Sequence, residues 1–183
     1  MSVSLYDSTV KTFARQLRNL SAILTKAQQW CEDNGKPHSE LLEARLAPDM
    51  FPLPYQVRNC TNQARNGTLL SNGTWTWMVS SARPDDEHTF EGLQARIQRT
   101  VEWLEGIREE DIKGGEDMPV EVWSSGEPGR GMVTKFDSGH KLLMQIVFPQ
   151  FWFHETTAYA ICRMKGVPLG KMDFLLGSGT LAW

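Results

Sequence analysis

One histidine near the carboxyl end of the chain has surroundings in which it could do chemistry. His154 lies within the segment PQFWFHETTAYAICRMKG, residues 149–166. Apolar residues recur around it at helical spacings of three and four: Val147, Phe151, Ala158 and Ile161. The segment is therefore expected to form a helix that carries His154 on an apolar stripe, with the imidazole directed into the bundle and towards the start of the second long helix.

Two interpretations of His154 remain open from the sequence. An imidazole has an unperturbed pKa of about 6.5, so His154 suits the role of a general acid or base at neutral pH. Alternatively, it is a core histidine whose ring nitrogens are satisfied by Gln56, a backbone carbonyl or water. The neighbouring Glu155 is expected to pair with Arg58 or Arg163 in a structural network rather than to take part in catalysis.

Other polar and aromatic candidates are expected to gather around His154. Asp49 and Tyr159 would assist catalysis, and the predicted substrate-binding residues are Phe51, Gln56, Gln150, Phe151 and Thr157. Asp49 precedes the second helix in the Pro-rich segment APDMFPLP, so it could instead be the cap of that helix. Thr157 could bond to a carbonyl in the preceding turn, and Tyr159 could be a core ring.

The elements that must position these residues are mainly helical. Apolar periodicity predicts four long helices, which run from Asp7-Ser8-Thr9 to Cys31, over about 53–70, from a Thr89 cap to Ile107, and from an Asp137-Ser138 cap to Arg163. Pro149 predicts a kink near residues 147–148 in the last of them. Arg96 is expected on the solvated face of the third helix, and residues 169–176 are expected to pack on the bundle.

Two segments have the two-residue period of strands instead. PVEVW and MVTKF, around residues 119–136, flank a loop that contains glycine and proline and predict a β-hairpin. TWTWMV also looks strand-like, with Trp75 and Trp77 on one side. The expected fold is thus mainly α: one domain over residues 1–183, built as a four-helix bundle with a small β-hairpin inserted before the last long helix.

Composition excludes several function classes. The formal charge of −3 provides no basic surface for nucleic acid and no basic anchor for a membrane, and no apolar run is long enough to span one. The N-terminal residues lack the pattern of a secretory signal, so a cytoplasmic location is expected. Cys31, Cys60 and Cys162 have neither disulfide nor zinc-site spacing, and we expect them to be buried thiols.

Several of these segments resemble a known family. Similarity to a domain of unknown function placed with the DinB/YfiT-like metalloenzymes is found in three segments: RLAPDMFPLPYQV, TFEGLQARIQRTVEWL and FPQFWFHETTAYAICRMKGVPLGKMDFL. A fourth segment, SLYDSTVKTFARQLRNLSAIL, resembles the first helix of that family. The resemblance covers most of the chain. It implies a DinB-like four-helix bundle, a fold that is often dimeric in that superfamily, and no assigned reaction.

The resemblance also implies where a metal would be held, and this chain departs from that pattern. Superfamily members hold a divalent metal with one histidine on the second helix and two, four residues apart, on the last. Here Ala158 follows His154 by four residues, Gln150 precedes it by four, and the second helix has no histidine; His38, His88 and His140 lie elsewhere. We therefore expect no metal and no redox cofactor.

Three functions remain in competition. The favoured one is a small-molecule enzyme of isomerase, lyase or cyclase type, which uses His154 without a cofactor. The alternatives are a metal-dependent DinB-like transferase or hydrolase, and a non-catalytic ligand-binding or dimeric stress-related protein. No phosphate-binding loop or nucleophile elbow is present, which disfavours kinase, dehydrogenase and esterase chemistry.

Overall fold

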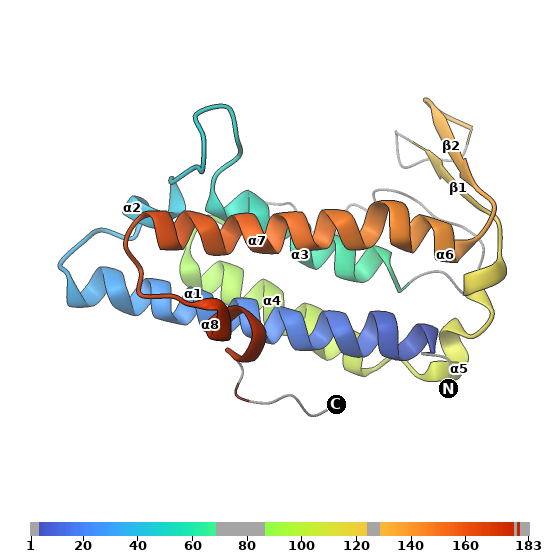
Figure 1. Cartoon of the computed structure of the whole chain (residues 1–183), viewed down its shortest axis with the longest axis horizontal. Helices are drawn as coiled ribbons and strands as arrows, with labels where there is room; N and C mark the ends of the chain where they lie inside the picture. Colours follow the sequence, from blue (N-terminus) through green and yellow to red (C-terminus); the bar gives the residue numbers. More distant parts are fainter. Residues whose placement is uncertain (1–3, 69–86, 124–128, 178, 180–183) are drawn as a thin grey trace.

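The computed structural model describes residues 4–68, 87–123, 129–177 and 179, and four long helices dominate this part of the chain (Figure 1). The long helices are α1 (Thr12–Asp33), α3 (Leu53–Asn66), α4 (Phe90–Glu105) and α7 (Phe148–Met164). The shorter α-helices are α2 (Ser39–Leu42), α5 (Glu109–Ile112), α6 (Gly139–Leu142) and α8 (Lys171–Leu176). Two π-helical turns, η1 (Asp7–Lys11) and η4 (Leu143–Val147), and the 3-10 turn η3 (Gly115–Asp117) complete the helical elements.

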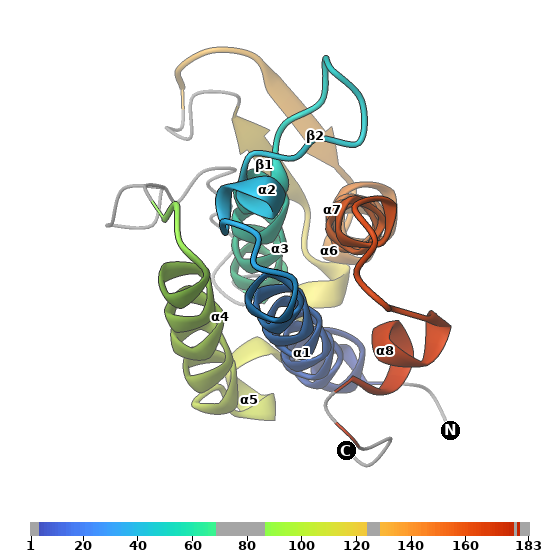
Figure 2. The same ribbon diagram turned by 90° about the vertical axis from the view of Figure 1, so that its left-hand side faces the viewer.

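The long helices pack as a bundle, seen end-on in Figure 2. α3 packs most closely against α7, and α1 against α4, while α3 also contacts α4 and α1. Each helix buries one apolar stripe between its neighbours. The rings of Phe13 on α1 and Phe151 on α7 lie 4.8 Å apart in this core, and both side chains are fully buried.

The predicted hairpin is confirmed. β1 (Val120–Trp123) pairs antiparallel with β2 (Val133–Phe136), in a register that sets Val120 opposite Phe136. Val120, Val122 and Phe136 are buried, so one face of the hairpin is turned inward, as so small a sheet requires. The hairpin leads directly into α6 and lies at that end of the bundle (Figure 1).

Helix starts follow capping chemistry, with one correction. Thr89 accepts a hydrogen bond from Gly92 N at 3.0 Å, and Ser138 accepts one from Lys141 N at 3.2 Å, so both predicted caps are confirmed. The cap predicted at Asp7-Ser8-Thr9 is wrong. Helical backbone already begins at residue 5, because Ser4 Oγ accepts a hydrogen bond from Asp7 N at 3.0 Å.

The distortion expected from Pro149 takes the form of a π-helical turn. Pro149 has no N–H to donate to the carbonyl of Gln145, and its ring crowds that carbonyl. The turn η4 ends at Val147, two residues before the proline, and its extra residue makes room for the ring. The chain then continues in helical geometry as α7, which carries His154.

Two further boundaries differ from expectation. α3 ends at Asn66 with Gly67 as its C-terminal cap, rather than near residue 70. The segment that carries Trp75 and Trp77 lies outside the described residues. At the carboxyl end, Leu169 is buried and α8 packs against α1, so residues 169–176 lie on the bundle as expected. Among the described helices, none combines the length and apolarity that a membrane crossing demands.

Candidate functional site

His154 meets the start of α3, as the sequence predicts. The imidazole is half-buried, and its Nδ1 lies 2.7 Å from Gln56 Oε1. Gln56 is itself buried, and its Nε2 donates to the carbonyl oxygen of Phe51 at 2.8 Å. Because the amide nitrogen is committed to that carbonyl, the amide oxygen must face the imidazole as an acceptor. His154 Nδ1 therefore carries the proton, and this N–H donates a hydrogen bond to Gln56 Oε1.

This arrangement fixes the tautomer of His154. With its proton on Nδ1, the ring presents a lone pair on Nε2, the nitrogen that a general base uses. Burial lowers the pKa of His154 below its ordinary value, which favours the neutral ring at neutral pH. A half-buried neutral imidazole with a fixed tautomer is suited to accept a proton and to return it.

Two aromatic rings contact the imidazole, and a third stacks on one of them. Tyr55 and Phe153 meet the imidazole edge-on, with ring centroids 6.0 and 5.3 Å away, and Phe51 stacks on Tyr55 at 4.0 Å. Phe51 and Phe153 are each 56% exposed. These three residues, Phe51, Tyr55 and Phe153, are called the aromatic patch below. Tyr55 and Phe153 were not predicted as site residues, although they directly precede Gln56 and His154 in the chain.

A second polar contact joins the same two helices farther along. Gln63 Nε2 on α3 donates to Gln150 Oε1 on α7 at 2.8 Å. Gln150 lies one turn before His154, and Gln63 lies two turns after Gln56. The predicted substrate-binding residue Gln150 therefore serves as a helix-to-helix contact on the His154 side of α7.

The structure does not bring the remaining predicted site residues to His154. Phe151 is fully buried in the core, and Thr157 Oγ1 donates to the carbonyl of Phe153 at 2.7 Å, the local role that the sequence left open. Tyr159 packs its ring edge-on against Phe174 of α8, with centroids 6.0 Å apart. Asp49 is exposed in the loop before α3; Pro52 occupies the cap position without a side-chain bond, so the capping interpretation of Asp49 is wrong.

Glu155, rather than His154, occupies the interior of the bundle. Its side chain is fully buried, and neither carboxyl oxygen has a hydrogen-bond partner within the described residues. Burial raises its pKa well above the ordinary value, an effect that the charge of Arg15 on α1 opposes. The predicted ion pairs are wrong, because Arg58 donates to the carbonyl of Glu87 at 3.1 Å and Arg163 to that of Val167 at 3.4 Å.

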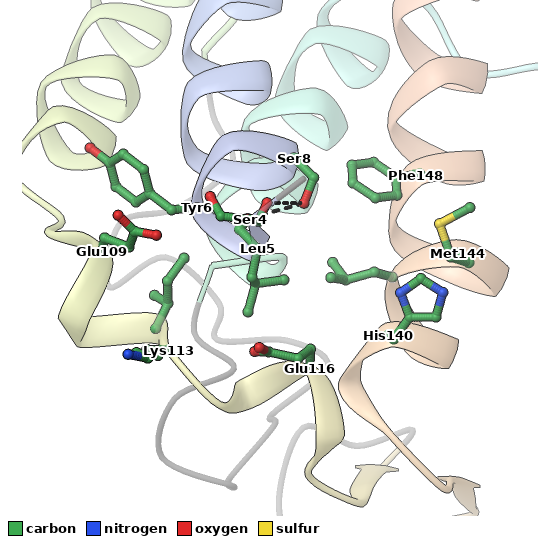
Figure 3. A pocket seen from close by; sticks show the side chains of 12 residues that line it. Ser4, Leu5, Tyr6, Ser8, Glu109, Lys113, Glu116, His140, Met144 and Phe148 are labelled. Atoms are coloured by element: carbon green, nitrogen blue, oxygen red, sulfur yellow. Dashed lines mark hydrogen bonds between the residues drawn. The ribbon is translucent and has the colours of Figure 1, made fainter. Parts of the chain in front are cut away.

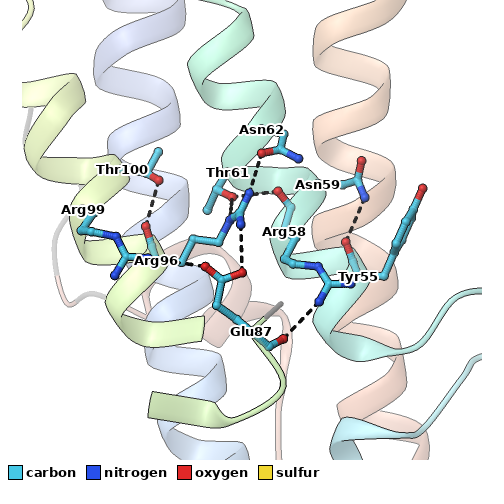
Figure 4. Close-up of polar contacts among 9 residues, drawn as sticks. All are labelled: Tyr55, Arg58, Asn59, Thr61, Asn62, Glu87, Arg96, Arg99 and Thr100. Atoms are coloured by element: carbon cyan, nitrogen blue, oxygen red, sulfur yellow. Dashed lines mark hydrogen bonds and ion pairs between the residues drawn. The ribbon is translucent and has the colours of Figure 1, made fainter. Parts of the chain in front are cut away.

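The expectation that Arg96 faces solvent is also wrong. Its guanidinium is buried between α3 and α4, where it binds Thr61 Oγ1 at 2.7 Å, Asn62 Oδ1 at 2.6 Å and Glu87 Oε2 at 2.9 Å (Figure 4). Each of these three partners is a side chain whose oxygen accepts a hydrogen bond. This cluster clamps the chain entering α4 onto α3, and its satisfied donors indicate a structural role.

The largest described cavity lies away from His154, at the end of the bundle where η1, α5 and η4 meet. It has a volume of about 540 Å³ and is lined by Leu5, Ile112, Leu143 and Phe148, with Lys113, Glu116 and His140 among its polar residues (Figure 3). Both π-helical turns contribute residues to its wall. His154 is not among the residues that line this cavity.

The donor set does not fit the metal of the DinB superfamily. Within the described ranges, no three histidine, cysteine, aspartate or glutamate side chains converge in a way that could hold a metal ion. His154 stands beside an amide, which is a weak ligand for a transition metal. The three cysteines are free and buried as expected, and burial raises the pKa of Cys162 to about 12, which leaves it a poor ligand and nucleophile.

Comparison with known proteins agrees with this architecture. Residues 5–175 match the family described as a domain of unknown function (DUF1993). A crystal structure of a DinB family member protein from Shewanella denitrificans is similar, with a TM-score of 0.80 and 31% sequence identity over 98% of this chain and 94% of that one. The predicted DinB-like fold is thereby confirmed. No curated protein matches the chain.

Proposed function

The chain belongs to the DUF1993 family and has a DinB-like fold, and on that premise we propose that it is a small-molecule enzyme in which His154 is the general acid–base residue. One observation carries the proposal: the hydrogen bonds from His154 Nδ1 to Gln56 and from Gln56 to the carbonyl of Phe51. They orient the imidazole and leave Nε2 able to take a proton. No metal or redox cofactor is part of the proposed reaction.

The chemistry is limited to steps that one base can perform. His154 Nε2 removes a proton from the substrate, and the resulting imidazolium keeps its Nδ1–H bond to Gln56. The same proton then returns to another atom of the substrate or to the leaving group, which describes an isomerisation, an elimination or a cyclisation. Gln56 is neutral, so it orients the ring without the added basicity that a carboxylate would give.

The aromatic patch supplies the binding surface in this proposal. The rings of Phe51 and Phe153 are exposed beside the imidazole, and exposed aromatic side chains in one place mark a contact surface. They favour a substrate with a flat apolar part that stacks on them.

The test has a spectroscopic step and a catalytic step. Imidazole nitrogen NMR should show His154 as the Nδ1–H tautomer. Aromatic compounds found to bind the purified protein should shift the resonances of His154 and Phe153. For any such compound that is converted, His154→Gln should lower turnover by roughly 100-fold or more, the usual contribution of general acid–base catalysis.

His140→Gln is the matched control, because His140 lies at the bundle-end cavity rather than at the aromatic patch. It should leave turnover unchanged. If His154→Gln kept the turnover of the wild type while the protein stayed folded, the acid–base role would be refuted.

The exposed rings also favour a second candidate, a homodimer that meets through the aromatic patch. In that case Phe51 and Phe153 would be covered by the same residues of a second copy. Sedimentation of the wild type would show a dimer, and Phe153→Ser would dissociate it, whereas Met172→Ser, an equally exposed change on α8, would not. A monomer that binds aromatic compounds would instead favour the enzyme.

A further inference from the structure

A second cavity, separate from the His154 site, lies beside the start of α3. It has a volume of about 400 Å³, and its apolar lining is formed by Leu42, Pro52 and Pro54. Its remaining lining residues can carry charge: Glu43, Arg45, Arg58 and His88. Two guanidinium groups and one carboxylate thus line the cavity, in a chain whose formal charge is −3. A local excess of positive charge in an acidic protein needs a specific explanation.

Both arginines are anchored by neutral groups. Arg45 Nη1 donates to the carbonyl of Met50 at 2.5 Å. Arg58 Nη1 donates to that of Glu87 at 3.1 Å (Figure 4). Elsewhere, arginines such as Arg96 and Arg108 form ion pairs with carboxylates. In the described part of the chain no carboxylate pairs with Arg45 or Arg58, and Arg58 Nε has no acceptor. Backbone carbonyls hold their positive charges in place, and within the described residues no ion pair neutralises them.

We propose that this cavity binds the anionic group, a phosphate or a carboxylate, of a small organic molecule. A guanidinium matches the paired oxygens of both anions with two parallel hydrogen bonds. Because a backbone carbonyl already anchors each arginine, less side-chain entropy is lost on binding. The prolines and Leu42 offer an apolar surface to the organic part, and a volume of about 400 Å³ leaves room for it beyond the anion.

Recognition at this site depends on side chains rather than on the helix terminus. The first N–H groups of α3 are already used, since Leu53 N donates to the carbonyl of Ala44 and Tyr55 N to that of Pro52, each at 3.1 Å. Pro54 has no N–H to offer. The arginine side chains must therefore supply the hydrogen bonds and most of the charge.

The anion site is distinct from the proposed enzyme site. Pro54 and Arg58 are one turn apart on the flank of α3 that meets residue 87, whereas Gln56 faces α7 and contacts His154. Each residue of a helix turns by about 100°, so residues 56 and 58 are separated by about 200° around the axis, or about 160° the shorter way. The two sites can therefore be altered one at a time.

The experiment is an NMR titration of the full chain at fixed ionic strength with four probes: inorganic phosphate, phenyl phosphate, benzoate and benzyl alcohol. Phenyl phosphate or benzoate should shift the amide resonances of residues 42–45, 53, 55–58 and 88, and neutral benzyl alcohol should not. Arg45→Gln and Arg58→Gln should each weaken binding at least tenfold. Glu43→Gln should tighten it severalfold, because it removes the opposing charge.

Arg18→Gln is the matched control, since Arg18 is an arginine that pairs with Glu105 on another face. It should leave binding unchanged. Equal shifts with phosphate and phenyl phosphate would identify free phosphate as a ligand, and stronger shifts with benzoate would identify a carboxylate. Shifts confined to other residues, or binding that survives both arginine changes, would overturn the proposal. Should Arg58→Gln fail to fold, the exposed Arg45 and Glu43 still decide the outcome.

Discussion

His154 and Glu155 are neighbours in the sequence and have opposite surroundings in the fold. A helix turns by about 100° per residue, so consecutive side chains point to different sides of α7. His154 reaches the edge between α3 and α7, where the amide oxygen of Gln56 accepts a hydrogen bond from its Nδ1–H. Glu155 points into the core, where its carboxyl meets no hydrogen-bond donor in the described chain.

Gln56→Leu tests the contact that orients His154. The change removes the acceptor of the imidazole Nδ1–H, and we expect the free energy of unfolding to fall by about 1 kcal/mol, the usual net value of one hydrogen bond. Imidazole nitrogen NMR should also show a mixture of tautomers. Gln98→Leu is the control, because Gln98 donates to Glu102 on the exposed face of α4, away from His154. Unchanged tautomer signals in Gln56→Leu would show that Gln56 does not set the tautomer.

Glu155 should make stability depend on pH. Burial raises its pKa well above the ordinary 4.5, so the folded chain keeps a proton that the unfolded chain gives up near that pH. The contribution of Glu155 to stability is thus complete below about pH 4.5 and is lost as the pH rises towards its folded-state pKa. The free energy of unfolding should fall with pH by up to about 1.4 kcal/mol per unit in this window.

The measurement is urea unfolding of the wild type and of Glu155→Gln between pH 5 and pH 8. The difference between their free energies of unfolding should shift steadily in favour of the variant as the pH rises, because glutamine cannot ionise. Other titrating groups are common to both proteins and cancel. Parallel pH profiles would show that Glu155 keeps an ordinary pKa.

At the scale of elements, the join between α3 and α4 depends on a buried arginine. The side chain of Arg96 is 7% exposed and pairs with that of Glu87, which is 11% exposed. Removing one member of a buried ion pair leaves the other charge uncompensated. Arg96→Met should therefore lower the free energy of unfolding by about 3–5 kcal/mol, measured by chemical denaturation.

Arg99 provides the comparison for that change. It contacts the other oxygen of Glu87, but its side chain is 43% exposed, so water can replace it. Arg99→Met should cost no more than about 1 kcal/mol, as exposed ion pairs do. Equal losses for the two variants would contradict the assignment of Arg96 as the buried clamp.

The last long helix shows how an element accommodates a local conflict. Pro149 lies within an otherwise continuous helical segment. The helix does not end there; instead, the π-helical turn η4 precedes the proline. The same turn contributes Leu143 and Met144 to the wall of the bundle-end cavity. Pro149, which disfavours a regular helix, thus affects the wall of the bundle-end cavity several residues away.

At the scale of the whole molecule, Gly67 lies where several elements converge. A Cβ atom added there would lie 2.8 Å from the ring of Phe13 on α1 and 2.9 Å from Val147 in η4. Real Cβ atoms do not approach so closely, and both neighbours are fixed in the core. Gly67→Ala should therefore lower the free energy of unfolding by about 1–3 kcal/mol, the usual cost of overpacking.

Gly106→Ala is the matched control in thermal unfolding. Gly106 also follows a long helix and has a negative φ of −77°, but its nearest contacts are backbone oxygens at 3.5 Å or beyond. We expect its melting temperature to stay within a few degrees of the wild type, or to rise slightly. A comparable drop in both variants would mean that loss of glycine at a helix end, rather than crowding, is responsible.

Local sequence determined the elements of this protein. Apolar spacing located the four long helices, Thr89 and Ser138 marked two of their starts, and the alternation around residues 119–136 located the hairpin, because each signal arises from residues close together in the chain. The approach of His154 to Gln56 was also predictable, since two stripes on adjacent helices must meet.

Only the tertiary structure decided which face of each helix is buried and which is exposed to solvent. Glu155 was expected to pair with an arginine and Arg96 to face solvent. The rotation of α7 and α4 within the bundle instead buries Arg96 and leaves Glu155 buried without a hydrogen-bond partner in the described residues. The cavity with Arg45 and Arg58 likewise forms from three segments that the sequence does not place together. Helical periodicity gives the order of side chains around an axis, but only packing against other helices fixes how that axis is turned.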